Sequence, residues 1–142
     1  VWVSAGEFKD RGGCYAQYIA ADADRIYALP DGVDLEQAAG LANYQVAWHL
    51  LHSATQGFLY DWVLVPAAAG GVGSALLQLC RAAGKRAIGL VSSKEKAAFC
   101  IEQGAVGAIN YRTGDIAAEI HTLKFKNSTR AFAPSNTFSK NI

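Results

Sequence analysis

Apolar and polar residues alternate in short runs between residues 1 and 33. The first run begins at Val1, a second covers residues 14–22, and a third covers residues 25–30 and ends at Pro30. Alternation with a period of two is typical of half-buried strands, and proline ends such a run because it cannot donate to a sheet ladder. The pattern therefore predicts a β-rich segment over residues 1–33.

A helical pattern follows this segment. Asp34 is a suitable N-cap, since its carboxylate can accept a hydrogen bond from a backbone N–H in the first turn. We expect a helix over residues 35–54 that is broken or bent at Gly40 or at the pair Asn43-Tyr44.

From residue 61 onwards, short apolar runs alternate with longer segments whose apolar residues recur with a helical period. This order is typical of a parallel sheet with crossover helices, so the predicted fold class is α/β. Residues 124–142 are rich in Ser, Thr and Asn, and we expect them to be irregular. Strands are predicted over residues 62–65, 86–92 and 106–112, and helices over residues 70–84, 93–104 and 115–123.

Composition narrows the function classes. The 142 residues are 51% hydrophobic and 18% charged, with a net charge of +1 and no Lys/Arg block. A nucleic-acid partner is not expected, because phosphate binding needs clustered cations, and no apolar run is long enough for a membrane span. The three cysteines lie far apart, and His49 and His52 lack a third ligand, so no metal site is expected. No paired carboxylates or Ser-His-Asp set stands out, so no catalytic residue is assigned.

A glycine-rich turn between the first predicted strand and helix of this region carries the main chemical signal. Residues 68–73 read Ala-Ala-Gly-Gly-Val-Gly, which is G-x-G-x-x-G with alanine in the first position. Gly70 would let the backbone approach a pyrophosphate, and Gly73 would let the helix pack closely on the strand. The free N–H groups at the helix start would face the phosphates. A tight turn in a packed α/β domain is the alternative interpretation.

The end of the second predicted strand indicates which dinucleotide would bind. An NAD site places Asp or Glu about 20 residues after the glycines, to bind the ribose hydroxyls. This chain has Ser92, Ser93 and Lys96 in that region, and Glu95 lies inside the next helix. Hydroxyl and ammonium groups favour a 2′-phosphate, and hence NADP. The alternative is an N-cap serine followed by an exposed helix face.

Several motifs together resemble a known family. They are "YDWVLVPAAAGGVGSALLQLCR", "GGCYAQY", "LPDGVDLEQAAGL", "AWHLL" and "GAVGAINYR", in this family's order and spacing. They resemble the quinone oxidoreductase (zeta-crystallin) branch of the zinc-free medium-chain dehydrogenase/reductase superfamily over residues 1–123. The resemblance implies a GroES-like catalytic domain, a Rossmann domain, and NADPH in the cleft between them.

The resemblance also implies roles for individual residues. Ser92 matches the position near the adenosine ribose, Lys96 the lysine that pairs with the 2′-phosphate, and Tyr111 a tyrosine near that phosphate. Val46 stands where the family has a threonine beside the nicotinamide, and valine cannot donate a hydrogen bond there. The pyrophosphate loop of the family is matched by Ala69, Gly70, Gly71, Val72 and Gly73.

Placed on the family's layout, the chain divides into three parts. Residues 1–33 would be the C-terminal part of the GroES-like domain, residues 34–123 the first half of an NADP-binding Rossmann domain, and residues 124–142 a divergent tail. We expect a cytoplasmic NADPH-dependent reductase of a small-molecule quinone or enone, homodimeric in full-length relatives and incomplete in this chain. A catalytically inactive remnant that binds nucleotide, and the enoyl-reductase domain of a larger synthase, remain alternatives.

Overall fold

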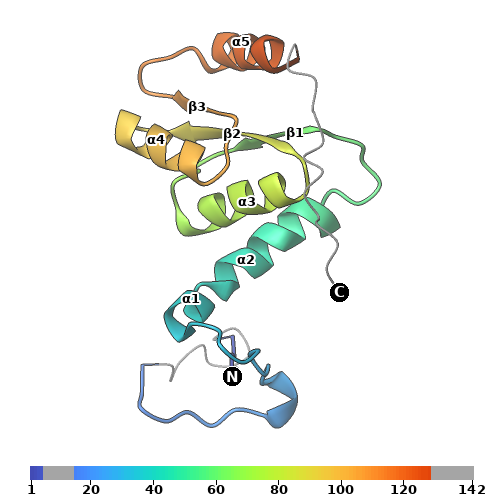
Figure 1. Cartoon of the computed structure of the whole chain (residues 1–142), viewed down its shortest axis with the longest axis vertical. Coiled ribbons are helices and arrows are strands. Elements are labelled where there is room, and N and C mark those ends of the chain that lie inside the picture. Colours follow the sequence, from blue (N-terminus) through green and yellow to red (C-terminus); the bar gives the residue numbers. More distant parts are fainter. Residues whose placement is uncertain (5–14, 129–142) are drawn as a thin grey trace. The chain divides into compact units, whose positions relative to one another are not determined.

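The computed structural model describes residues 1–4 and 15–128, and for residues 125–128 it describes only the backbone. The described chain divides into two compact units, Val1–Phe58 and a second that begins at Leu59 (Figure 1).

The first unit is built mainly from short helices. They are η2 (Ala23–Arg25), α1 (Leu35–Ala39), α2 (Leu41–Trp48) and the π-helix η3 (His49–Ser53). The predicted cap of α1 is confirmed, because the Asp34 carboxylate accepts a hydrogen bond of 2.9 Å from the Gln37 N–H. The predicted break is at Gly40, where α1 ends and α2 begins, while Asn43 and Tyr44 lie inside α2.

The strands predicted for residues 1–33 are wrong where the structure describes this segment. Residues 15–22 form no strand, and a single antiparallel bridge joins Trp2 to Tyr27 through hydrogen bonds of 2.7 and 2.9 Å. Tyr15 and Tyr18 are fully or almost fully exposed. A strand needs a neighbour for its N–H and C=O groups, and apart from that bridge the described residues of this segment provide none. Residues 5–14, including Cys14, lie outside the described part.

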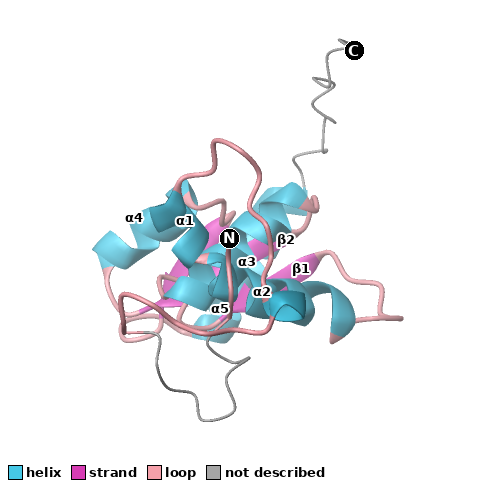
Figure 2. Cartoon of the chain, turned by 90° about the horizontal axis from the view of Figure 1, so that it is seen from below, coloured by secondary structure: helices cyan, strands magenta, loops and turns pink. Residues whose placement is uncertain are grey.

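The second unit has the predicted order of strands and helices. Its elements are β1 (Trp62–Val65), α3 (Gly71–Ala82), β2 (Arg86–Val91), α4 (Lys94–Glu102), β3 (Gly107–Asn110) and α5 (Ile116–Ser128). In Figure 2 the strands, drawn in magenta, all belong to this unit.

The three strands form a parallel sheet, as predicted, and their order in the sheet is β1-β2-β3. Val65 pairs with Gly89, and Gly89 pairs with Ala108, so these three residues point to one face. A Cβ added at Gly89 would lie 3.3 Å from the Cys100 Sγ, which places α4 over this face. The next residue back along β3, Gly107, therefore points to the other face.

Helices cover both faces of the sheet. A Cβ at Gly107 would lie 2.8 Å from the Leu123 side chain, which places α5 on the face opposite α4. A Cβ at Gly104, just after α4, would touch the Arg81 side chain of α3, so α3 and α4 lie side by side. Figure 1 shows the resulting layers, with α3 and α5 on opposite sides of the strands. The core between these layers consists of small and branched side chains, namely Val65, Ala68, Ala75, Leu77, Cys80, Ala87, Ile88, Val91, Cys100, Ala105 and Ile109.

Local signals stop most of these helices where the sequence predicts. Gly84 and Gly104 follow α3 and α4 with φ values of +67° and +110°, a conformation that side chains with a Cβ rarely adopt. Asp115 caps α5, because its carboxylate accepts from the N–H groups of Ala117 and Ala118 at 2.9 and 3.2 Å. The prediction that residue 124 begins an irregular tail is wrong by five residues, since α5 continues through Ser128. Residues 129–142 lie outside the described part.

Candidate functional site

The glycine-rich turn joins the carboxyl end of β1 to the start of α3. A Cβ at Gly73 would lie 2.6 Å from the Ala67 carbonyl oxygen and 2.7 Å from the Ala68 Cα. Cβ atoms essentially never lie this close to backbone atoms, so Gly73 permits the close packing of α3 on the turn that the sequence predicts. Gly70 precedes α3 in extended backbone and offers no side chain to cap the helix.

The start of α3 is therefore suited to an anion. The first N–H groups of a helix lack partners inside the helix and carry a partial positive charge. Gly70 and Gly71 are both exposed, so an anion can approach these groups closely without meeting a side chain. This arrangement fits the pyrophosphate role predicted for the loop.

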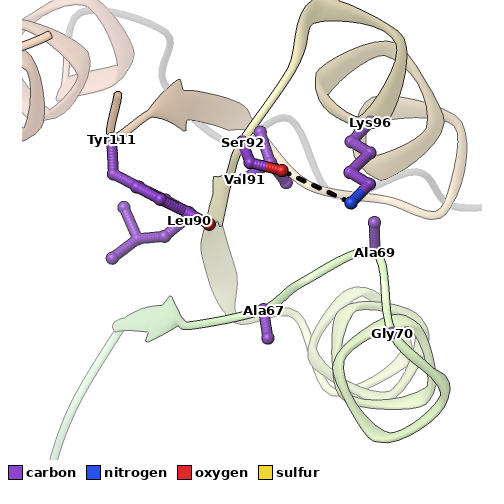
Figure 3. A pocket seen from close by; sticks show the side chains of 8 residues that line it. All are labelled: Ala67, Ala69, Gly70, Leu90, Val91, Ser92, Lys96 and Tyr111. Carbon is purple, nitrogen blue, oxygen red and sulfur yellow. Dashed lines mark hydrogen bonds between the residues drawn. The ribbon is translucent and has the colours of Figure 1, made fainter. Parts of the chain in front are cut away.

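A cavity of about 250 Å³ opens beside the turn, within the second unit. Whole drug-sized ligands occupy cavities of about 300–1,000 Å³, so this one fits a portion of a dinucleotide. The turn forms one wall and the ends of β2 and β3 form the other (Figure 3). Its lining residues are Ala67, Ala69, Gly70, Leu90, Val91, Ser92, Lys96 and Tyr111.

Lys96 supplies the positive charge of this cavity. It lies one turn into α4, and its ammonium donates a hydrogen bond of 3.3 Å to the Ser92 hydroxyl, just after β2. Figure 3 shows this pair on the side of the cavity that faces Ala69. An exposed ammonium beside a hydroxyl can bind a phosphate through charge-assisted hydrogen bonds.

The neighbouring serine has a different role. The Ser93 hydroxyl accepts a hydrogen bond of 3.3 Å from the Lys96 N–H and so caps α4. It also bonds the exposed Glu95 carboxylate and thereby lowers the pKa of that group. Ser93 is not one of the residues that line the cavity, so the helix-cap interpretation applies to Ser93 and the cavity interpretation to Ser92.

Tyr111 closes the cavity at the end of β3. Its N–H donates a hydrogen bond of 3.0 Å to the Val91 carbonyl, which continues the pairing of β2 with β3 by one residue. Figure 3 shows its ring beside the Leu90 side chain. The ring is half exposed and so remains available to a ligand.

The structure brings together half of the predicted site residues. One cavity is lined by Ala69, Gly70, Ser92, Lys96 and Tyr111, although they come from three separate parts of the chain. Three further loop residues, Gly71, Val72 and Gly73, form the first turn of α3 beside it. Val46 lies on α2 in the first unit, half exposed, and its predicted place near a nicotinamide stays a prediction.

Three lining residues were not predicted. Leu90 and Val91 end β2, and the carboxyl ends of parallel strands are the usual place for ligands in α/β sheets, so their position was a usable signal. Ala67 is the third, and its backbone conformation, with φ of +49°, has no signature in the sequence.

The cysteines and the possible metal ligands form no further site among the described residues. Cys80 and Cys100 are buried free thiols, and burial raises the pKa of both. Within residues 1–4 and 15–128, no three His, Cys, Asp or Glu side chains gather closely enough to hold a metal ion. Among the same residues, no helix has the length and hydropathy required to cross a membrane.

The sequence of the chain is similar to those of known proteins. No family model matches the chain. The quinone oxidoreductase of Sus scrofa is 35% identical over 102 residues, which cover 70% of this chain and 31% of that protein. A 2-haloacrylate reductase of a Burkholderia species is 34% identical over 114 residues, which cover 78% of this chain and 34% of that protein.

Solved structures agree with these relatives. The Escherichia coli quinone oxidoreductase complexed with NADPH matches with a TM-score of 0.66 and 32% identity, over 72% of this chain and 32% of that one. A quinone oxidoreductase of Pseudomonas syringae matches with a TM-score of 0.64 and 38% identity, over 71% and 31%. The chain thus spans about a third of the length of these relatives. Over that part, its sequence and fold are similar to those of the quinone oxidoreductase branch of the medium-chain dehydrogenase/reductase superfamily.

Proposed function

We propose that this chain binds NADPH at the glycine loop and belongs to a protein that reduces quinones or related electron-poor alkenes. One observation carries the proposal: the cavity that joins the glycine loop to Ser92, Lys96 and Tyr111. The family relation supports it, because relatives are named for quinone and haloacrylate reduction and several were crystallised with NADPH.

The residues present fit the cofactor in two places. The first turn of α3, which begins at Gly71, offers backbone N–H groups to the pyrophosphate, and a side chain at Gly73 would disrupt the close packing of α3 on the turn. Lys96 and Ser92 offer an ammonium and a hydroxyl to the 2′-phosphate, and Tyr111 lines the same cavity. Among the described residues, none that lines the cavity is Asp or Glu, the residue type that would favour the unphosphorylated ribose of NAD.

This arrangement determines which roles belong to the protein and which to the cofactor. When bound, NADPH supplies the reducing equivalent, so the protein needs to bind and orient rather than to provide a nucleophile. The described cavity holds the adenosine side of the cofactor. Placement of the nicotinamide beside an acceptor, the role of Val46, and homodimerisation are further parts of the proposal.

Calorimetric titration of the purified chain tests cofactor binding directly. We expect NADPH and 2′,5′-ADP to bind, and NADH to bind more weakly than NADPH. Absence of binding by both NADPH and 2′,5′-ADP at millimolar concentration, or tighter binding of NADH than of NADPH, would overturn the proposal. The acceptor is then tested by following loss of NADPH absorbance with a benzoquinone and with a simple enone, using the chain within its longest available reading frame.

A further inference from the structure

Ala67 has a backbone conformation that distinguishes it from every other described residue except glycines. Its φ is +49°, in the left-handed region, which residues with a Cβ occupy uncommonly. The other described residues with positive φ are all glycines, namely Gly32, Gly57, Gly84 and Gly104. Strained conformations of this kind persist where the surrounding structure holds them, often next to ligand sites.

The pairing of β1 with β2 shows what this conformation achieves. The Arg86 N–H donates to the Asp61 carbonyl, and the register then runs from Trp62 opposite Arg86 to Val65 opposite Gly89. Continued in this register, the ladder would bring the N–H of residue 67 to the Leu90 carbonyl. In the structure, Ala68 donates to that carbonyl, at 3.3 Å. One extra residue is therefore accommodated between β1 and the glycine loop, and the left-handed turn at Ala67 accommodates it.

The same turn sets the position of the glycines. The Ala67 carbonyl accepts a hydrogen bond of 2.9 Å from the Gly70 N–H. It also lies 3.2 Å from where a Cβ of Gly70 would be and 2.6 Å from where a Cβ of Gly73 would be. Ala67 thus lies beneath the loop, and it lines the same cavity as Ser92 and Lys96.

We infer that Ala67 is a positioning residue for the nucleotide site: its left-handed backbone holds the glycine loop at a fixed distance from the Ser92–Lys96 side of the cavity. This inference rests on the proposed NADPH site. A glycine would adopt the same φ without strain, but its greater backbone freedom would let the loop leave this position more often. Alanine at this point favours a rigid loop at the expense of local stability.

The inference is tested by Ala67→Gly, with Gly84→Ala as the matched control. Gly84 has φ of +67° with no atom within 4 Å of an added Cβ, so Gly84→Ala creates a left-handed alanine at the far end of α3. For Ala67→Gly we expect NADPH affinity to fall about two- to fivefold, from the added freedom of one glycine. The midpoint of thermal unfolding should be unchanged or higher, because the strain is removed. For Gly84→Ala we expect a lower midpoint and unchanged NADPH affinity.

Hydrogen exchange of backbone amides separates this inference from the NADPH proposal. In the unliganded chain, Ala67→Gly should speed hydrogen exchange of the Gly70 amide about two- to fivefold, and Gly84→Ala should leave this exchange rate unchanged. Unchanged Gly70 exchange in Ala67→Gly would overturn the inference whether or not NADPH binds. Parallel losses of affinity and stability in Ala67→Gly would also overturn it, since they would indicate a purely structural residue. If the parent chain binds no NADPH, the proposed function fails and the exchange result alone decides the role of Ala67.

Discussion

Substitution of Lys96 by alanine should weaken NADPH binding while leaving NADH binding nearly unchanged. The two cofactors differ only by the 2′-phosphate, and Lys96 is the one cationic side chain among the described residues that line the cavity. Its ammonium is exposed, and its hydrogen bond to the Ser92 hydroxyl is 3.3 Å long, slightly beyond the usual range for N–H···O bonds. Lys96 therefore loses only a weak hydrogen bond when its ammonium binds a phosphate instead of the Ser92 hydroxyl.

The size of the effect follows from this exposure. A hydrogen bond to a charged group contributes about 1.5–3 kcal/mol, and solvent and salt reduce that value for an exposed ammonium. We expect a loss of about 1–2 kcal/mol, which is a factor of about 5–30 in the dissociation constant of NADPH. The loss should shrink as salt is added, because screening weakens the parent chain's contact more than the variant's.

Lys94→Ala is the matched control, since Lys94 is an exposed lysine on the same first turn of α4 but does not line the cavity. Both variants change the net charge equally, so a general electrostatic effect would appear in both. Titration of NADPH, NADH and 2′,5′-ADP into the three proteins checks the prediction. Equal losses for NADPH and NADH in Lys96→Ala, or equal losses in the two lysine variants, would remove Lys96 from the 2′-phosphate site.

Three further predictions concern stability and turnover. Gly73→Ala should lower the free energy of unfolding by about 1–3 kcal/mol in urea titrations, because its Cβ would meet backbone atoms at 2.6–2.9 Å; unchanged stability would contradict the packing described. Burial raises the pKa of Cys80 from 9.0 to about 11, although Lys85 opposes the shift. The buried thiol therefore stabilises the fold below pH 9 and loses up to about 2–3 kcal/mol of that contribution between pH 9 and 11; Cys80→Ala should flatten this dependence, and an identical pH profile would refute it. The 142-residue polypeptide assayed by itself should oxidise NADPH with a quinone at less than about one-tenth of the rate of a full-length relative; equal rates would show that it holds the nicotinamide unaided.

Elements with their own start and stop signals were predictable from the sequence. Asp34, Ser93 and Asp115 are short polar side chains that accept from N–H groups two or three residues later, and each begins a helix in the structure. Gly84 and Gly104 end α3 and α4 because a left-handed residue stops the helix. These signals act within one turn of chain, so no tertiary information is needed to interpret them.

Elements that depend on distant partners, or that lack a stop signal, were not predictable from the sequence. Residues 15–22 carry an alternating pattern, but alternation specifies only which faces a strand would have, and it supplies no neighbouring strand. At the other end, residues 124–128 contain neither glycine nor proline, so nothing in the sequence ended α5 at the predicted residue. Propagating a helix by a turn costs little once it has formed, and α5 continues to Ser128.

The candidate site also contains both residues whose role was predictable from the sequence and residues whose role was not. Gly70 and Gly73 were identified because a Cβ would be crowded at Gly70, 3.2 Å from the Ala67 carbonyl oxygen, and would meet backbone atoms at 2.6–2.9 Å at Gly73, so the residue type itself indicates the geometry. Alanine fits many conformations, and its presence at position 67 reports none of them. The left-handed φ there results from one residue more than the β1–β2 register accommodates, which becomes visible only when the register is known. If the hydrogen-exchange and binding experiments bear out the role of Ala67, the sequence motif must be read together with the length of the connection that precedes it, because the glycines need a correctly placed carbonyl beneath them.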